Sequence, residues 1–351
     1  MTEYVAPPRD DRSIWDLWLT ANYQAAIVAA DEKNLFGLLD EVPATIAELA
    51  VRLDSNERAT GILVRLLASL GLVTHTSGRF ELSEVARIYL VRSSPYYWGH
   101  MMRVGVSEWH LNTLLSKLKP KGAVQRPEDM LPSATGEGRM SDGWASGNVT
   151  LEQAKGVAAR MHSHSLPAAI GAARNYDFGG IRRVLDVGGG SGCFAIAMAQ
   201  QHPHLRCTIL ELSAMCDVAK TYIEAGEVAS RVDTRAVNMF REPWPEGYDA
   251  LFFSNIWHDW SFETCRWLAR RAFDVLAPGG RILLHEMLLN DDGTGPPTTA
   301  SFSMLMLLAT QGQQFTFGES KAIMQDAGFV QIETKRTYGY YSITTGHKPS
   351  A

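Results

Sequence analysis

The chain is poor in cysteine and pairs none of its cysteines closely. Four cysteines occur among 351 residues, and no two of them form a CxxC motif. Zinc knuckles and disulfide frameworks depend on such pairs, so the sequence argues against both kinds of site. Single thiols of this kind fit a reducing cytoplasm, where we expect the protein to be located.

Long apolar runs and an excess of positive charge are also absent. No run of about 18 apolar residues occurs, and such a run is what a membrane-spanning helix requires. The first residues, MTEYVAPPRDDR, contain no apolar segment of the kind found in signal peptides. The net charge of −5 gives no positive field for nucleic acid. We therefore expect neither a membrane nor a nucleic acid as partner.

Glycine, by contrast, is concentrated in the stretch 184–200, VLDVGGGSGCFAIAMAQ. The β-branched start predicts a strand, the glycines predict a tight turn, and the apolar residues that follow predict a helix. Glycine lets the backbone approach a ligand closely, and the start of the new helix offers unpaired N–H groups. This pattern predicts a nucleotide-like cofactor.

The spacing of the glycines distinguishes two cofactors. The dinucleotide fingerprint has glycine at its first, third and sixth positions, but the sixth position counted from Gly188 is Cys193. The chain instead has Asp-x-Gly-x-Gly-x-Gly, from Asp186 through Gly188 and Gly190 to Gly192. We therefore favour S-adenosylmethionine over NAD. A glycine turn that only packs is the remaining alternative.

Helical patterns dominate the first hundred residues. Residues 14–40 predict a pair of helices, and residues 45–73 predict two more, the first opened by a capping box of Thr45 and Glu48. A hairpin around Gly78 follows. Helix, turn, helix and hairpin together predict a winged helix.

Winged helices often bind DNA, but the second helix of this one offers only Arg58 and Arg65 as cations. Its leucines require burial instead. We therefore expect the module to pack in a dimer or against another domain. Trp18, Ile62 and Leu66 belong to helices with more apolar surface than a small winged helix needs for its own core, which favours a homodimer.

The segment from 95 to 178 is mixed. Helices are predicted at 104–119 and 151–175, separated by a loop with Gly, Pro and Ser residues. Helices that join a small module to a cofactor domain commonly wall a substrate pocket. The candidates for that wall, each with ordinary core packing as its alternative, are Tyr96, Tyr97, Trp98, Trp109, Trp144 and Met161.

Strands and helices alternate beyond the glycine turn. The predicted strands lie at 207–212, 232–237, 248–255 and 279–288, and two more lie at the C-terminus. The predicted helices between them lie at 215–225, 263–276 and 320–328. Such alternation predicts a mostly parallel sheet with helices on both faces. Ligands of such sheets bind where the strands end.

Strand ends carry the candidate cofactor contacts. Glu211 closes a strand about 20 residues after the glycine turn, where an acid accepts hydrogen bonds from ribose hydroxyls. Asn238, Met239 and Phe240 follow the next strand, an amide beside two groups that could enclose an adenine ring. Ser254, at the end of the strand 248–255, is assigned to the same site.

Two strand ends carry candidate catalytic groups. His258 follows the strand 248–255, and its imidazole titrates near neutral pH, so it could take a proton from a substrate hydroxyl. His285 and Glu286 lie near the end of the next strand, and Glu286 could hold the tautomer of His258. A satisfied polar group at a strand end is the alternative for each.

These motifs together resemble the S-adenosylmethionine-dependent O-methyltransferases of the plant phenolic and bacterial natural-product type. The resemblance rests on LDVGGGSG, Glu211, the WHDW at 257–260, PGGRILLHE and the C-terminal YYSITTGHKP. It implies an α/β fold, with a Rossmann-like class I methyltransferase sheet and an N-terminal, mostly helical winged-helix dimerisation domain. A homodimer that acts on a small molecule is also implied.

The resemblance divides the chain and assigns its residues. Residues 1–102 would form the dimerisation domain, 103–178 a helical linker that walls the substrate pocket, and 179–351 the S-adenosylmethionine-binding catalytic domain. His258 matches the family's base and Glu286 the acid that orients it. The substrate candidates are Met161, which matches the methionine beside the methyl acceptor, and Tyr96, Tyr97, Trp109, Trp257 and Met304.

Two positions depart from the family pattern. Asn238 stands where the family has an aspartate, a mild change because an amide oxygen still accepts a hydrogen bond. Gln314 stands where the family has a second glutamate near the catalytic histidine. An amide cannot supply the negative field that makes an imidazole more basic.

Gln314 leaves the accepting atom open. A hydroxyl oxygen that loses its proton to His258 is favoured, and a carbon or a thioether sulfur, which needs no strong base, is the alternative. A cofactor-binding regulator without turnover is disfavoured by the presence of His258 together with Glu286. No metal is expected; the alternative is an ion held by His162, His164, His258 and His285.

Overall fold

The computed structural model describes residues 3–120 and 140–350, which form two compact units. The sheet unit comprises residues 3–12, 140–288 and 317–350, and the helical unit comprises residues 13–120 and 289–316. Within the described residues, no helix is both long enough and apolar enough to cross a membrane.

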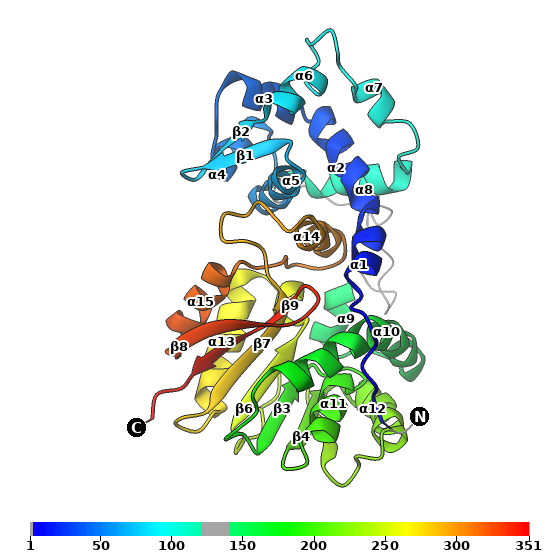
Figure 1. The fold of residues 1–351 in the computed structure, drawn as a ribbon, viewed down its shortest axis with the longest axis vertical. Helices are drawn as coiled ribbons and strands as arrows, with labels where there is room; N and C mark the ends of the chain where they lie inside the picture. Colours follow the sequence, from blue (N-terminus) through cyan, green and yellow to red (C-terminus); the bar gives the residue numbers. More distant parts are fainter. Residues whose placement is uncertain (1–2, 121–139, 351) are drawn as a thin grey trace. The chain divides into compact units, whose positions relative to one another are not determined.

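The sheet unit is built on seven strands in the order β5-β4-β3-β6-β7-β9-β8 (Figure 1). The pairings β5-β4, β4-β3, β3-β6 and β6-β7 are parallel, whereas β9 is antiparallel to β7 and to β8. The mostly parallel sheet predicted from the alternation is confirmed. The strands are β3 (Arg183–Val187), β4 (Arg206–Glu211), β5 (Val232–Ala236), β6 (Ala250–Ser254), β7 (Arg281–Met287), β8 (Val330–Tyr338) and β9 (Tyr341–His347).

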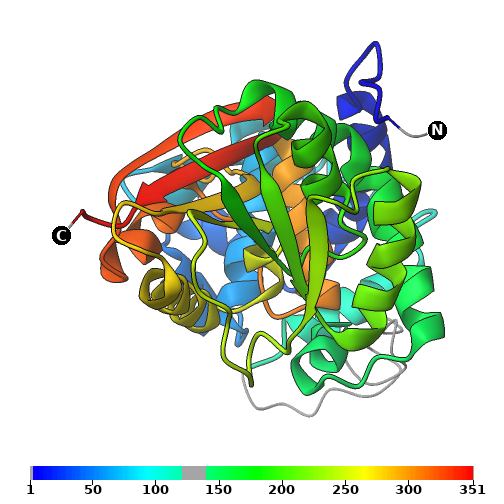
Figure 2. The same ribbon diagram turned by 90° about the horizontal axis from the view of Figure 1, so that it is seen from below.

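Helices cover both faces of this sheet. Figure 2 shows the green helices α10, α11 and α12 on one face, and the gold helix α13 and orange helix α15 on the other. The helices of the unit are α9 (Met140–Ser146), α10 (Leu151–Asn175), α11 (Cys193–Gln201), α12 (Ser213–Ala225), the short 3-10 helix Trp257–Asp259, α13 (Phe262–Val275) and α15 (Phe317–Asp326).

The central strands form because both of their faces are buried. Every residue of β3 after Arg183 is buried, and the same holds for Ala250–Phe253 of β6. Such continuous apolar runs are typical of parallel strands covered by helices. Side-chain caps begin the flanking helices: Thr150 and Gln153 form a capping box at α10, and Ser261 caps α13.

The helical unit contains the predicted winged helix. Helices α4 and α5 are followed by the antiparallel hairpin of β1 and β2, and the predicted capping box of Thr45 and Glu48 opens α4. The elements of the unit are α1 (Arg12–Leu19), α2 (Ala21–Glu32), α3 (Leu35–Glu41), α4 (Ile46–Arg52), α5 (Glu57–Ser69), β1 (Val73–Thr76), β2 (Arg79–Leu82), α6 (Glu84–Tyr89), α7 (Gly99–Met102), α8 (Glu108–Lys117) and α14 (Pro297–Ala309).

Two expectations about these helices are wrong. Residues 14–40 hold three helices rather than a pair, because Asn34 takes a left-handed conformation with φ of 56° between α2 and α3. Ile62 and Leu66 are buried inside the core of the helical unit itself, so they offer no surface for a dimer contact.

Helix α14 was not anticipated, and it changes how the chain divides. Met304 and Leu307 of this helix are buried in one core with Leu63 of α5, so residues 289–316 belong to the helical unit. The limits of the two units therefore differ from the predicted ranges 1–102, 103–178 and 179–351. The roles predicted for those three ranges stay predictions. The predicted loop between α8 and α10 lies largely in 121–139, outside the described residues.

The burial of Met304 generates a stability prediction. Met304→Ala should lower the free energy of unfolding by about 2–5 kcal/mol, because it removes a fully buried side chain and leaves a cavity. Thermal and denaturant unfolding measure the change. Met101→Ala, at a position 62% exposed, is the control and should leave the midpoint unchanged. Equal midpoints for both variants would show that α14 contributes nothing to this core.

Candidate active site

One large cavity lies in the sheet unit at the carboxyl ends of β3, β4 and β6. It encloses about 1130 Å³ of empty space, its open mouth included. The wall contains the glycine turn after β3, Glu211 at the end of β4, Ser254 at the end of β6, and Met161 and His164 from α10. Its position is the one at which sheets of this kind bind ligands.

The glycine turn has the backbone conformation that the sequence predicted for it. Gly188, Gly190 and Gly192 all have positive φ, at 72°, 55° and 80°. A Cβ atom on Gly188 would stand 2.5 Å from Ile256 Cδ1, whereas one on Gly190 would meet nothing within 4 Å. The positive φ favours glycine at both positions, and the space beside Gly190 leaves its backbone open to a ligand.

Two buried acids face this cavity. Burial raises the pKa of Asp186 to about 7, and the charge of Glu211 adds to the effect. Burial likewise raises the pKa of Glu211 to about 7. Hydrogen bonds from Leu212, Gly190 and the Trp144 side chain act in the opposite direction and lower it. Asp186 Oδ2 has no hydrogen-bond partner among the described residues. Acids held in this way favour a ligand with hydroxyl groups and positive charge, and S-adenosylmethionine has both.

The other predicted cofactor residues lie in different surroundings. Met239 and Ser254 line the cavity, but Asn238 and Phe240 are not among the lining residues. The Asn238 amide is already bonded, since Nδ2 donates to Ala145 O at 3.3 Å and Oδ1 accepts from Phe240 N at 3.0 Å. The Phe240 ring meets Trp260, a lining residue, edge-on at 4.5 Å. The adenine role of both residues stays a prediction.

His258 and Glu286 form a buried pair. His258 Nδ1 lies 2.8 Å from Glu286 Oε2, and the His258 backbone N–H donates to Glu286 Oε1 at 3.4 Å. Burial lowers the pKa of His258, but the charge and hydrogen bond of Glu286, with the charge of Asp259, raise it above its usual value. The structure thus brings together the two residues that the sequence predicted to meet.

Asp259 is a cavity residue that the sequence analysis considered only as the neighbour of His258 in the WHDW motif. It lines the cavity while His258 does not, and its Oδ1 lies 3.8 Å from His258 Nε2. Burial raises the pKa of Asp259 to about 6, with His258 opposing and Glu286 reinforcing the shift. The WHDW motif contained the signal, because a residue next to His258 at a strand end faces the same ligand site.

Helix α10 places five residues on the cavity wall: Val157, Ala158, Met161, His164 and Ser165. Met161 was predicted there, and His164 was considered only as a metal ligand. His164 Nε2 lies 3.4 Å from Met161 Sδ, as the i, i+3 spacing on one helix face allows. Burial lowers the pKa of His164 to about 4, and the nearby His258 adds to the shift. His164 is therefore a neutral polar group at this wall.

The remaining predicted substrate and catalytic residues lie elsewhere. Trp257 is fully buried and does not line the cavity. Five others belong to the helical unit: Tyr96, Tyr97, Trp109, Met304 and Gln314. Tyr96 and Trp109 are exposed, whereas the Tyr97 hydroxyl bonds to Asp31 and Arg92. Met304 and Gln314 are buried, and the Gln314 backbone N–H donates to Ser303 Oγ at 3.0 Å. Their substrate and catalytic roles stay predictions.

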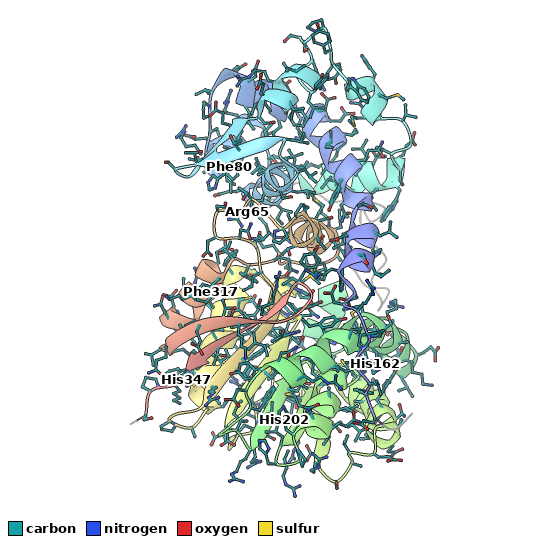
Figure 3. All side chains as sticks on the ribbon, in the orientation of Figure 1. Arg65, Phe80, His162, His202, Phe317 and His347 are labelled. Carbon is teal, nitrogen blue, oxygen red and sulfur yellow. The ribbon has the colours of Figure 1, made fainter. Side chains whose placement is uncertain are left out.

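The four histidines considered for a metal are engaged separately. His162, labelled in Figure 3, has Nδ1 2.9 Å from Ser191 Oγ and stacks on Tyr222. His285 Nδ1 lies 2.9 Å from Ser254 Oγ. Among residues 3–120 and 140–350, no cluster of three or more His, Cys, Asp or Glu side chains is arranged to hold a metal ion.

Two family models match the sequence. Residues 123–330 match the O-methyltransferase domain, and residues 15–92 match the O-methyltransferase dimerisation domain. The chain belongs to the O-methyltransferase family. The winged helix of the helical unit is thus part of this family's dimerisation domain.

Individual relatives of this O-methyltransferase cover nearly all of it. It is 33% identical to 3-hydroxy-5-methyl-1-naphthoate 3-O-methyltransferase of Streptomyces sahachiroi, over 91% of this chain and 88% of that one. It is 27% identical to the O-methyltransferase family 2 protein of Planctomyces limnophilus, solved with apigenin, with a TM-score of 0.85 over 98% of both chains. Human N-acetylserotonin methyltransferase, solved with S-adenosylmethionine, shares the fold at 23% identity and a TM-score of 0.57, over 99% and 100% of the two chains.

These matches confirm several predictions from the sequence. The protein is an S-adenosylmethionine-dependent O-methyltransferase of small molecules, with a class I methyltransferase sheet and an N-terminal helical dimerisation domain. Oxygen is thus favoured over carbon and sulfur as the accepting atom. The roles of single residues remain to be argued from the geometry.

The two buried acids generate a binding prediction. Glu211→Gln should weaken binding of S-adenosylhomocysteine by about 1–3 kcal/mol at pH 8, because the amide loses a charge-assisted contact. The wild-type affinity should fall as the pH decreases through 7, since both carboxyl groups then take up protons. The variant should show a shallower dependence.

Calorimetric titration from pH 6 to pH 9 measures both effects. Glu224→Gln, an exposed position on α12, is the matched control and should bind like the wild type. An unchanged affinity in Glu211→Gln would remove Glu211 from the cofactor site.

Proposed function

We propose that the enzyme methylates a phenolic hydroxyl on a flat, apolar molecule, with His258 as the base that removes its proton. The observation that carries this proposal is the buried pair of His258 Nδ1 and Glu286 Oε2 at 2.8 Å. Because Glu286 accepts the hydrogen on Nδ1, the neutral imidazole is left with a bare Nε2. That nitrogen lies 3.8 Å from a carboxylate oxygen of Asp259, a residue of the cavity wall.

The chemistry follows from this tautomer. His258 Nε2 takes the hydroxyl proton as the acceptor oxygen forms its bond to the methyl carbon, and the electrons of the broken carbon–sulfur bond stay on sulfur. Glu286 then stabilises the imidazolium by its charge. S-adenosylmethionine, when bound, supplies an electrophilic methyl group on a positively charged sulfur. A cavity that held acceptor and cofactor together would lower the entropic part of the barrier.

A phenol suits this base better than an alcohol. Phenols of the tyrosine type have a pKa of about 10, within a few pH units of an imidazole whose pKa lies above its usual value. The cavity wall offers Met161, Met215 and Trp260 to an apolar ring, and neutral His164 to a further polar substituent. The naphthoate named for one relative and the apigenin of one solved structure support an aromatic acceptor.

We assign the cofactor to the residues around the glycine turn. The backbone of Gly188 and Gly190 and the unpartnered Asp186 oxygen would hold its amino-acid and sugar parts, and Glu211 would bind the ribose hydroxyls. Met239 lines the side expected for adenine. This assignment is supported by the cavity's shape and charge.

A homodimer is the proposed assembly. The dimerisation domain supports it, and so does an apolar surface on α1, where Ile14, Leu17 and Trp18 are exposed. Trp18 remains a candidate for the dimer contact. We assign that contact to α1 rather than to α5. Solitary apolar residues are common on surfaces, but three on one short helix favour an interface.

The base role predicts a large loss of turnover. His258→Ala should lower kcat by about 10²–10⁴, the usual effect of losing a general base. His204→Ala, at an exposed histidine, is the control and should keep wild-type activity. Steady-state kinetics with a phenolic acceptor measure the difference. If His258→Ala retained more than about a tenth of the wild-type kcat, proton removal would not limit the reaction.

The same pair determines the pH profile. Activity should rise with pH through the pKa of His258, because only the neutral imidazole is a base. Glu286→Gln removes the charge that raises this pKa while burial continues to lower it, so the rising limb should move to lower pH. If the rising part of the pH–activity curve were unchanged in Glu286→Gln, a group other than His258 would be responsible for it.

The assembly prediction concerns α1. The wild-type protein should have twice the 38.7 kDa mass of one chain by light scattering at micromolar concentration. Trp18→Arg should shift it toward the monomer, because a buried charge at the contact is costly. Val51→Arg, at a position 82% exposed on α4, is the control and should remain dimeric. A monomeric wild type would refute the homodimer.

A further inference from the structure

A chain of three polar side chains joins the C-terminal hairpin to the cavity wall. It runs from Thr337 on β8 through His285 on β7 to Ser254 at the end of β6. His285 Nε2 lies 3.3 Å from Thr337 Oγ1, and His285 Nδ1 lies 2.9 Å from Ser254 Oγ. Ser254 is the member that lines the cavity.

His285 is enclosed on all sides and stays neutral. It has no exposed surface, its ring is parallel to that of Tyr341 at 4.8 Å, and Phe194 meets it edge-on at 5.0 Å. Burial lowers the pKa of His285 to about 3. A neutral imidazole has one N–H donor and one bare nitrogen acceptor.

The direction of the hydrogen bonds depends on which acceptor takes the hydroxyl hydrogen of Thr337. Its hydroxyl donates to the backbone carbonyl of Tyr341 at 3.2 Å, and a carbonyl oxygen only accepts. The same hydroxyl lies 3.3 Å from His285 Nε2, and assigning its single hydrogen to the Tyr341 carbonyl leaves a lone pair of Thr337 for His285. The imidazole hydrogen consequently lies on Nε2, and Nδ1 is the bare acceptor.

Ser254 must then donate its own hydrogen to His285 Nδ1. Only the lone pairs of Ser254 Oγ remain for the cavity, so this serine accepts hydrogen bonds there and cannot donate. We propose that Thr337 and His285 are positioning residues that make Ser254 an obligate acceptor for the ammonium group of S-adenosylmethionine.

The choice of the ammonium group follows from the order of the strands, and it rests on the proposed function. The residues assigned to adenine follow β5, Glu211 ends β4, and the glycine turn follows β3; β6 is next in the sheet. Ser254 ends β6, so it lies on the side away from adenine, where the amino-acid end of the cofactor belongs. Of the two charged groups at that end, only the ammonium donates hydrogen bonds.

Calorimetric titration with two ligands tests this arrangement without turnover. The first ligand is S-adenosylhomocysteine, and the second is its analogue with hydrogen in place of the amino group. The proteins are the wild type, Ser254→Ala, His285→Leu, His285→Asn and the double variant Ser254→Ala/His285→Leu. His285→Asn retains an acceptor oxygen near the place of Nδ1, whereas His285→Leu fills the space without one. Thermal unfolding identifies any variant that does not fold.

Ser254→Ala and His285→Leu should each weaken S-adenosylhomocysteine binding by about 10-fold, the effect of losing one hydrogen bond to a charged group. The double variant should bind no more weakly than Ser254→Ala, because His285 acts through Ser254. His285→Asn should stay within about threefold of the wild type. The analogue without the amino group should bind all folded variants alike.

Independent, additive losses in the double variant would overturn the proposal, and so would equal losses with the analogue that lacks the amino group. A loss in His285→Asn as large as in His285→Leu would also contradict it. Because these titrations involve no proton transfer at His258, failure of the base role would leave their outcome unchanged.

Discussion

Parallel pairing of β3 with both β4 and β6 is the constraint on which the site depends. The pairing aligns Asp186 with Ile209 on one side and with Phe252 on the other, so the three strands end at one edge. The parallel pairing of β6 with β7 extends that edge to His285. Asp186, Glu211 and Ser254 thereby face one cavity, although no local interaction brings them together.

Buried charge is distributed in two ways around this edge. Asp186 and Glu211 face the cavity, and their pKa values are raised to about 7. A bound cation would stabilise the ionised form of both carboxyl groups. Glu286 instead faces His258, and its charge favours the protonated imidazole. The first arrangement favours a positively charged ligand, whereas the second fits the base role that we propose for His258.

Three histidines of the sheet unit differ because their surroundings differ. Burial lowers the pKa of His164 to about 4, with the nearby His258 adding to the shift, and burial lowers the pKa of His285 to about 3. His258 has Glu286, which outweighs the effect of burial. One side-chain type thus occurs in three different states, and for His258 and His285 the neighbours concerned, Glu286 and Ser254, are distant in the sequence.

The sequence by itself determined the features that depend on local pattern. Apolar periodicity located the strands and most helices, the glycines located the cofactor turn, and strand ends pointed to Glu211 and His258, because each of these signals lies within a few residues. Only the tertiary structure decided that α14 packs into the helical unit, that Ile62 is core, and that Asp259 lines the cavity. It also placed Thr337, His285 and Ser254 in one hydrogen-bonded chain. These outcomes depend on contacts between segments far apart in the chain and on the exclusion of water around them.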